Sequence, residues 1–307
     1  MQAALVHNPS AGSGRLTAEQ ILELIREAGF SPHYLSAKDK NLSDRLAGVS
    51  GLVIAAGGDG TVARVITQLR DRQIPVAILP LGTANNIARA FGITGPVEEI
   101  VAGWHSGNER RLDIGVAGGP FEQLRFLEAV GIGALADTTS KKIKEEGSIA
   151  KQLERGRDAL RKVLRKAKPI KVKLTLDDRS LKEEVLLLEI MNIGFVGPNL
   201  RLATQADAGD GRFDVVFVPA DSRDEMLEWL EEPERRAAPV VVESGRSIIL
   251  DKNGAMLRVG DRHVPEAEGE VLIEIEHPSV TLLVPSVHKD HKKVVPRTGE
   301  PETGGKA

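Results

Sequence analysis

The fold of the N-terminal part of the chain is decided by one stretch, Leu52-Val-Ile-Ala-Ala-Gly-Gly-Asp-Gly-Thr61. It begins as an apolar run with the length of a buried strand and continues as a glycine-rich turn. Apolar residues at helical spacing follow, from Val62 to Leu69. The stretch therefore predicts a strand, a tight turn and a helix, with the turn at the carboxyl edge of a parallel sheet.

This turn has the composition of a phosphate-binding site. Consecutive glycines let backbone N–H groups face phosphate oxygens, and the N-terminus of the following helix adds a favourable field. Asp59 would face phosphate only through Mg²⁺ or a shell of water. A tight turn with a helix-capping aspartate is the alternative, but Gly57-Gly-Asp-Gly-Thr61 in this setting favours the phosphate site.

Two other turns are expected at the same edge. Asn8–Gly14 follows a predicted strand, Ala3–His7, and precedes a helix opened by a capping box at Thr17–Gln20. Leu81–Asn86 follows a further strand, Val76–Leu79. Each turn alone is a weak signal, but three such turns in one crevice predict a phosphate cradle. The chain has no P-loop sequence and no Gly-x-Gly-x-x-Gly fingerprint after a strand, so an ordinary P-loop NTPase is excluded.

The pattern of apolar runs divides the chain into two domains. Residues 1–112 alternate strands with helices, which predicts a three-layer α/β domain with a mainly parallel sheet. Residues 113–286 carry short, closely spaced β-type runs, which favour a β-sandwich with a helical insertion near 148–166. A second, acidic helix is expected near Asp224–Leu230. The polar tail, 287–307, is expected to be disordered.

The runs that predict the sandwich strands share short length, apolar or β-branched residues and flanking turn residues. They are Ile170–Leu176, Val185–Met191, Phe213–Val218, Val240–Glu243, Ser247–Leu250, Met256–Val259, Val271–Glu276 and Val280–Val284.

Composition narrows the class of protein. The chain of 307 residues is 41% hydrophobic and 28% charged, as in ordinary globular proteins, and it lacks cysteine, which excludes disulfides and thiolate metal sites. No apolar stretch approaches the ~18 residues that span a bilayer, and the N-terminus lacks the features of a secretory signal. Aromatic residues make up 3% of the chain, so nucleic-acid stacking is not expected. We expect a cytoplasmic protein that does not bind nucleic acid.

The net charge of −3 hides a basic segment. Lys141–Lys173 contains thirteen Lys or Arg against four Asp or Glu. A surface helix whose charges are solvated is one interpretation. The other is a docking face for an anionic membrane surface, which would place the protein peripherally at the inner membrane face.

Three of these motifs resemble the nucleotide-site motifs of the diacylglycerol kinase catalytic domain, whose family includes bacterial lipid kinases, sphingosine kinases and ceramide kinases. They are Asn8-Pro-Ser-Ala-Gly-Ser-Gly14, Gly57-Gly-Asp-Gly-Thr61 and Leu79-Pro-Leu-Gly-Thr-Ala-Asn-Asn-Ile-Ala-Arg89. Later stretches are also similar to motifs of that family: Arg111-Leu-Asp-Ile-Gly115, Ala129-Val-Gly-Ile-Gly133, Asn192-Ile-Gly-Phe-Val-Gly197 and Ala206-Asp-Ala-Gly-Asp-Gly-Arg-Phe-Asp214. The resemblance covers about Met1 to Pro285.

The resemblance implies that ATP binds with Mg²⁺ in a cleft between the domains and that its γ-phosphate passes to a hydroxyl of a diacylglycerol-like lipid. Asp59 matches the family's essential aspartate. The nucleotide contacts implied are Asn8, Pro9, Ser10, Gly12, Ser36, Gly57, Gly58, Asp59, Gly60, Thr61, Gly82, Thr83 and Asn85.

The resemblance also implies a metal site in the second domain. Asp210 matches its carboxylate, and backbone oxygens near Asp207 and Arg212 would complete it. Gly209 stands where the family usually has an acidic residue. A plain β-turn at Asp207–Gly211 is the alternative.

The general base is the point at which the sequence departs from the family pattern. The family usually has Asp-Gly-Glu late in the sandwich, and its Glu deprotonates the acceptor hydroxyl. Here the corresponding stretch is Arg258-Val-Gly-Asp-Arg-His263, so Asp261 is the expected base, with Glu266 in reserve and Glu268 nearby.

Three functions stay open at this point. The first and third turns favour a lipid kinase over an NAD kinase-like enzyme, which shares the Gly-Gly-Asp-Gly turn. A non-catalytic nucleotide- or lipid-binding relative with an altered base is the third possibility. The residues specify neither which lipid is phosphorylated nor the oligomeric state.

Overall fold

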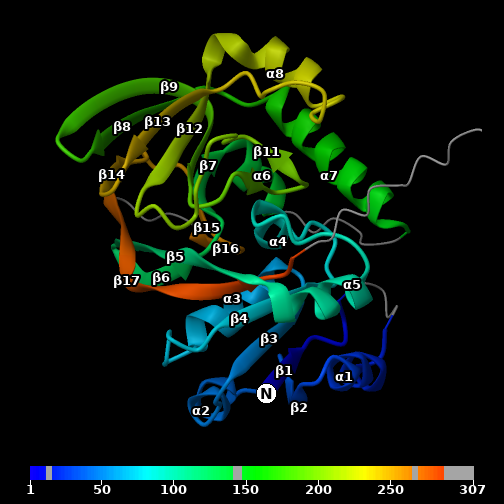
Figure 1. Ribbon diagram of the computed structural model, residues 1–307. Coiled ribbons are helices and arrows are strands. Elements are labelled where there is room, and N and C mark those ends of the chain that lie inside the picture. The colour runs from blue at the N-terminus through cyan, green and yellow to red at the C-terminus, as the bar shows by residue number, and fades with distance from the viewer. Residues whose placement is uncertain (12–15, 141–146, 265–268, 287–307) are drawn as a thin grey trace, which may run out of the picture.

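The computed structural model describes residues 1–11, 16–140, 147–264 and 269–286. An N-terminal α/β domain with a mainly parallel sheet is followed by a C-terminal β-sandwich-like domain (Figure 1). The predicted fold class is therefore confirmed. The tail, 287–307, lies outside the described residues.

The N-terminal domain is built on four parallel strands in the order β2-β1-β3-β4. These are β1 (Gln2–His7), β2 (Ser31–Ser36), β3 (Leu52–Gly57) and β4 (Val76–Pro80). Its helices are α1 (Ala18–Glu27), α2 (Leu42–Ala47), α3 (Asp59–Gln68), α4 (Asn86–Ala90), α5 (Val97–Ala102) and the 3₁₀ turn η2 (Gly103–Ser106).

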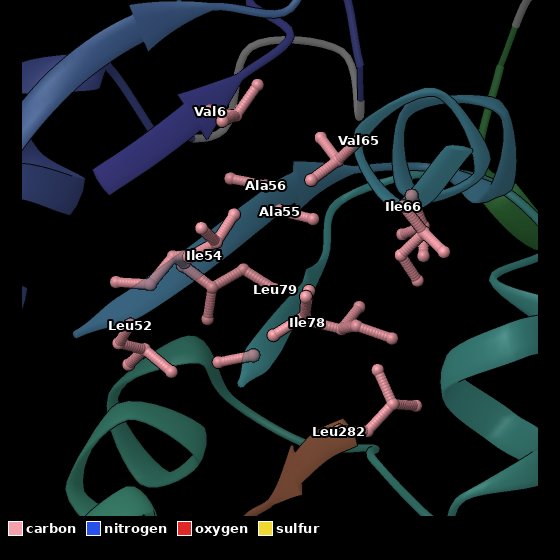
Figure 2. Packing of buried hydrophobic residues seen from close by; sticks show 14 of the residues in the cluster. Val6, Leu52, Ile54, Ala55, Ala56, Val65, Ile66, Ile78, Leu79 and Leu282 are labelled. Atoms are coloured by element: carbon pink, nitrogen blue, oxygen red, sulfur yellow. The ribbon is translucent and has the colours of Figure 1, made fainter. Parts of the chain in front are cut away.

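Burial explains why these segments form strands. Every residue of β3 is buried, so its continuous apolar run is that of a strand covered on both faces. Figure 2 shows Val6, Ile54 and Leu79 from neighbouring strands packed beside the α3 residues Val65 and Ile66. The start of α1 is fixed by the expected capping box. The buried sheet therefore holds the ends of its strands, and the turns that follow them, at one edge.

The C-terminal domain is formed by antiparallel strands. Its main strands are β7 (Ala129–Gly133), β8 (Ile170–Leu176), β9 (Arg179–Met191), β12 (Phe213–Pro219), β13 (Val241–Gly245), β14 (Ile248–Asp251), β15 (Leu257–Val259) and β16 (Arg262–Val264). A separate hairpin joins β10 (Phe195–Val196) to β11 (Leu200–Arg201). The helices are α6 (Ala134–Thr139), α7 (Ile149–Leu164), α8 (Arg223–Trp229) and the 3₁₀ turn η3 (Ala220–Ser222).

Two hydrophobic clusters fill this domain. β9 contributes to both, because Leu188 and Ile190 pack into the sandwich interior while Leu187 and Met191 pack toward the helices. Leu160 of α7 and other apolar residues of α7 and α8 complete the second cluster. The helix expected at 148–166 is therefore present and packs on the sandwich, with Ser148 as its N-cap.

Three strands join the two domains. β5 (Asn108–Gly119) pairs with β6 (Phe121–Phe126) and with β17 (Glu270–Val284). The sequence pattern predicted two strands within 271–284, and the structure has one, whose pairing with β5 shifts between Glu276 and Val280. Leu282 pairs in parallel with Val76 and lies in the core of the first domain (Figure 2). The sequence analysis placed the domain boundary between residues 112 and 113, which lie within strand β5. That boundary therefore stays a prediction.

Candidate active site

A cavity of about 650 Å³ lies at the carboxyl edge of the parallel sheet. Residues from all three predicted turns line it, as the order of parallel strands requires. The site residues singled out from the sequence that line it are Asn8, Ser10, Gly58, Gly60, Thr61, Gly82, Thr83 and Asp261. Asp261 comes from the sandwich domain, so the cavity is formed by both domains.

Glycine is required where two of the turns meet. A methyl group on Gly82 would overlap the Cα atom of Gly58 and would lie 2.8 Å from the Asn85 Oδ1 atom. The β3–α3 turn and the β4–α4 turn therefore approach each other as closely as bare backbone allows. Gly57 lies under the Thr61 side chain, which leaves no room for a Cβ atom there.

Polar side chains of the first two turns are held together by hydrogen bonds. Asn8 Nδ2 donates to Thr61 Oγ1 at 3.3 Å, and Asn8 Oδ1 accepts from the backbone N–H of Ser10 at 3.2 Å. Lys38 Nζ donates to Ser10 Oγ at 2.7 Å. Lys38 and Arg64 also line the cavity, although the sequence analysis did not single them out. Their positive charges suit a polyanionic ligand.

The third turn is organised by Asn85. Its backbone is in the left-handed region, with φ 51°, and its side-chain oxygen accepts from the backbone N–H of Gly82 at 2.9 Å. Its amide nitrogen donates to the carbonyl of Gly82 at 2.9 Å. Thr83 Oγ1 donates to Gln152 Oε1 at 2.8 Å, which ties this turn to helix α7 of the second domain.

Asp59 bridges the second and third turns rather than lining the cavity. Its Oδ1 atom accepts from the backbone N–H of Ile87 at 2.9 Å, at the start of α4. Burial raises the pKa of the Asp59 carboxyl, and the backbone N–H groups around it, those of Ile87 and Asn86 first, oppose that shift. The carboxylate is therefore only partly solvated, and a cation near it would stabilise its charge.

Glu128 is an acidic residue of this region that the sequence analysis missed. Its Oε2 atom accepts from Asn86 Nδ2 at 2.9 Å, and the same amide donates to the carbonyl of Gly197 at 3.0 Å. Burial raises the pKa of Glu128 to about 8, and the nearby carboxylates of Asp59 and Asp261 act in the same direction. At neutral pH the residue is therefore mostly protonated and adds little negative charge to the site. Its only sequence signal was its position just ahead of the glycine-containing strand.

Asp261 lies at the tip of the hairpin between β15 and β16. Gly260 takes the left-handed conformation there, with φ 58°, and its N–H donates to the carbonyl of Ala129 at 3.0 Å. Arg258 Nη1 donates to the carbonyl of Gly260 at 2.6 Å, and its Nη2 atom pairs with Glu189 at 2.5 Å. The side chains of Arg258 and Glu189 are only 6% and 0% exposed. This buried pair anchors the turn that carries Asp261.

The loop at Asp207–Arg212 lies elsewhere. The buried Asp113 holds it, because Asp113 Oδ2 accepts from the N–H of Gly211 at 2.8 Å. Asp207 Oδ1 accepts from the N–H of Gly209 at 3.2 Å and Asp210 Oδ1 from the N–H of Arg212 at 2.9 Å. No group of three potential metal-binding His, Asp or Glu side chains exists among the described residues. The metal site at Asp207, Asp210 and Arg212 stays a prediction.

The remaining predicted residues have supporting positions or cannot be placed. Ser36 Oγ accepts from the N–H of Lys38 at 3.2 Å, and Pro9 is exposed beside Ser10. Gly12 and the reserve base Glu266 lie outside the described residues, as do Glu268 and positions 141–146 of the basic segment. No helix of the described part of the chain is long and apolar enough to cross a membrane.

The parallel α/β domain and the β-sandwich-like domain thus share a glycine-rich cavity that Lys38 and Arg64 also line. The family model for the diacylglycerol kinase catalytic domain matches residues 2–117. The model for the YegS C-terminal NAD kinase beta sandwich-like domain matches residues 129–285. The chain belongs to the diacylglycerol kinase catalytic-domain family, a family of lipid kinases.

This chain is also similar to individual proteins in sequence and in structure. A diacylglycerol kinase of Bacillus subtilis is 29% identical over 233 residues, which cover 71% of this chain and 73% of the relative. The crystal structure of a diacylglycerol kinase from Bacillus anthracis has a TM-score of 0.68 at 20% identity, covering 92% of this chain and 96% of the other. An NAD kinase from Archaeoglobus fulgidus in complex with ATP has a TM-score of 0.53 at 14% identity, covering 94% and 95%. The two solved structures show a shared fold.

Proposed function

We propose that the protein is an ATP-dependent lipid kinase that transfers the γ-phosphate of ATP to a hydroxyl of a diacylglycerol-like lipid. The observation that carries this proposal is the shared cavity. Three phosphate-type turns from one domain and the carboxylate of Asp261 from the other line the same space of about 650 Å³. A donor phosphate and an acceptor hydroxyl would meet between them.

The residues present fit a nucleotide polyphosphate. The close approach of Gly58 to Gly82 leaves backbone exposed to the cavity, and Lys38 and Arg64 supply positive charge. Mg²⁺ fits less completely, since among the described residues Asp261 is the carboxylate that lines the cavity, Asp59 lies beside it, and a bound ion would need phosphate oxygens and water as well. When bound, Mg²⁺ would neutralise charge on the phosphates.

Asp261 would act as the general base. It would accept the proton of the lipid hydroxyl as the oxygen of that hydroxyl bonds to the γ-phosphorus atom, while the bond to the β-phosphate oxygen breaks and ADP leaves. Its exposed position at a hairpin tip lets it reach the cavity, where its Oδ2 atom would lie 3.9 Å from a Cβ atom on Gly60. The protonated Glu128 would keep a third carboxylate charge away from the phosphates.

The basic segment is proposed to contact anionic membrane. Lys162, Arg165 and Lys166 at the end of α7 are exposed, whereas Arg161 is paired with Asp158. Leu160 and Leu164 are buried against the sandwich, so the apolar stripe of the helix is used for packing. The charged side of α7 is what remains for a membrane surface.

The proposal is tested by incubating the protein with ATP, Mg²⁺ and a lipid extract and measuring phosphate transfer to lipid. Asp59→Ala should abolish transfer in a folded protein, since Asp59 joins the second and third turns at the edge of the cavity. A parallel incubation contains NAD in place of the lipid extract, and phosphate transfer to NAD but not to lipid would support the NAD kinase alternative. ATP binding without transfer to any acceptor would support a non-catalytic relative.

A further inference from the structure

A second cavity, away from the nucleotide turns, is lined mainly by arginines. It has a volume of about 580 Å³ and is lined by residues from the C-terminal end of α4, the β10–β11 hairpin and the segment after α8. Its arginines come from three separate parts of the chain: Arg89, Arg201, and the neighbours Arg235 and Arg236. We call this space the arginine pocket.

The charge of the arginine pocket is strongly one-sided. Among the described residues that line it, four carry guanidinium groups and one, Glu234, carries a carboxylate. The Glu234 side chain is 84% exposed and pairs with Arg157 at 3.4 Å. Four like charges around one cavity repel one another, so an anion would be favoured there. Guanidinium groups match phosphate in particular, because they donate paired hydrogen bonds to two oxygens.

The arginines are available for such a ligand. Arg235 pairs with Glu232 and Arg236 with Glu228, and the four side chains of these pairs are at least 55% exposed. Exposed ion pairs of this kind are weak and can be exchanged for a phosphate group. Arg201 is positioned over the ring of Phe195, with 5.7 Å between its guanidinium carbon and the ring centroid, and donates to the carbonyl of Thr204 at 3.1 Å.

The pocket is connected to the nucleotide turn. Arg89 Nε donates to the carbonyl of Ala84, in the β4–α4 turn, at 3.3 Å. Asn199 also lines the pocket. With its amide oriented to match donors to acceptors, it donates to Ala84 O at 2.7 Å and accepts from Arg89 Nε at 3.1 Å. A phosphate held by these arginines would therefore lie one side chain away from the turn that carries Thr83.

We infer that Arg89, Arg201, Arg235 and Arg236 form a binding site for a phosphate group, separate from the nucleotide cavity. The phosphate belongs either to the headgroup of an anionic phospholipid or to a soluble phosphate ester. This inference stands apart from the proposed kinase activity, because its binding can be measured without ATP or an acceptor lipid.

The test uses the full chain and a triple variant, Arg201→Gln, Arg235→Gln and Arg236→Gln, which leaves Arg89 of the nucleotide-turn motif in place. A control variant, Arg26→Gln, Arg45→Gln and Arg246→Gln, loses the same charge from outside the pocket. Two probes are compared: glycerol 1-phosphate by calorimetry, and vesicles of phosphatidylcholine with and without phosphatidylglycerol by sedimentation. Circular dichroism checks that each variant is folded.

We expect the triple variant to lose about a hundredfold in binding, as three engaged cationic groups would give, while the control variant binds like wild type. If the triple variant loses binding to the vesicles alone, the site is assigned to a phospholipid headgroup. If it loses binding to glycerol 1-phosphate, the site is assigned to soluble phosphate esters. Equal binding of the triple and control variants to both probes would overturn the inference.

Discussion

The buried pair Arg258–Glu189 should control both the stability of the sandwich and the position of Asp261. Glu189→Leu leaves the Arg258 guanidinium buried, with the carbonyl of Gly260 as its one hydrogen-bond partner among the described residues, and a guanidinium cannot lose its proton. Removing one partner of such a pair costs roughly 3–5 kcal/mol. We therefore expect the free energy of unfolding of Glu189→Leu to fall by about that amount near neutral pH.

The reverse change has a different pH dependence. Arg258→Met leaves Glu189, whose pKa burial raises and Arg258 lowers, so loss of Arg258 raises this pKa further. A carboxyl whose pKa is raised on folding stabilises the fold below its unfolded-state pKa and loses that contribution as the pH rises through its folded-state pKa. The deficit of Arg258→Met should therefore be small in mild acid and grow toward alkaline pH.

The double variant separates the two roles of the pair. Glu189→Leu with Arg258→Met removes both charges, so its free energy of unfolding should return to within ~1–2 kcal/mol of wild type. The coupling energy of the cycle, from urea unfolding monitored by circular dichroism, should be at least ~2 kcal/mol. Phosphorylation by the double variant should still fall, by up to ~10²-fold, because the bond from Arg258 to Gly260 that holds the Asp261 turn is gone. The reasoning would be refuted if the double variant lost as much free energy of unfolding as the two single variants lose together.

Three further changes test other parts of the account. The pKa of Glu128 is raised to about 8, so its contribution to stability should be lost as the pH rises from the unfolded-state pKa of this carboxyl toward 8. Glu128→Gln should therefore weaken the fall in the free energy of unfolding over this pH range, as measured by urea unfolding. An unchanged pH profile would exclude Glu128 as the source of that fall. Gly82→Ala should push the third turn from Gly58 and raise the KM for ATP at least ~10-fold, whereas Gly118→Ala, whose added methyl meets nothing within 4 Å, should not. A triple variant, with Lys162→Gln, Arg165→Gln and Lys166→Gln, should bind anionic vesicles roughly a hundredfold more weakly than wild type at low salt, and the difference should be smaller at high salt. Equal sedimentation of the triple variant and wild type with these vesicles would leave α7 as a packing element.

The sequence predicted the parts of the fold that rest on local patterns. The apolar run at β3, the capping box at Thr17 and the turn residues after three strands are signals carried by neighbours in the chain. The order of parallel strands then places those turns at one edge, so much of the cavity wall could be foreseen.

The features that escaped prediction depend on contacts between distant segments. Arg258 and Glu189 are 69 positions apart, and nothing near either residue shows that both are buried. Glu128 meets Asn86 across the two domains, and Lys38 reaches Ser10 from the end of another strand. The two runs in 271–284 were separated because His277-Pro278 interrupts the apolar pattern, while their shared pairing with β5 makes them one strand.

The most direct test of the central proposal is the turnover of Asp261→Asn. The change keeps the shape of the side chain and removes its ability to accept a proton. Steady-state phosphorylation of diacylglycerol in mixed micelles should show kcat lowered by ~10² or more, with little change in the KM for ATP, since only proton removal is lost. An unchanged kcat in a folded Asp261→Asn protein would contradict the assignment of Asp261 as the base, and Glu266→Gln and Glu128→Gln would then be the variants to measure.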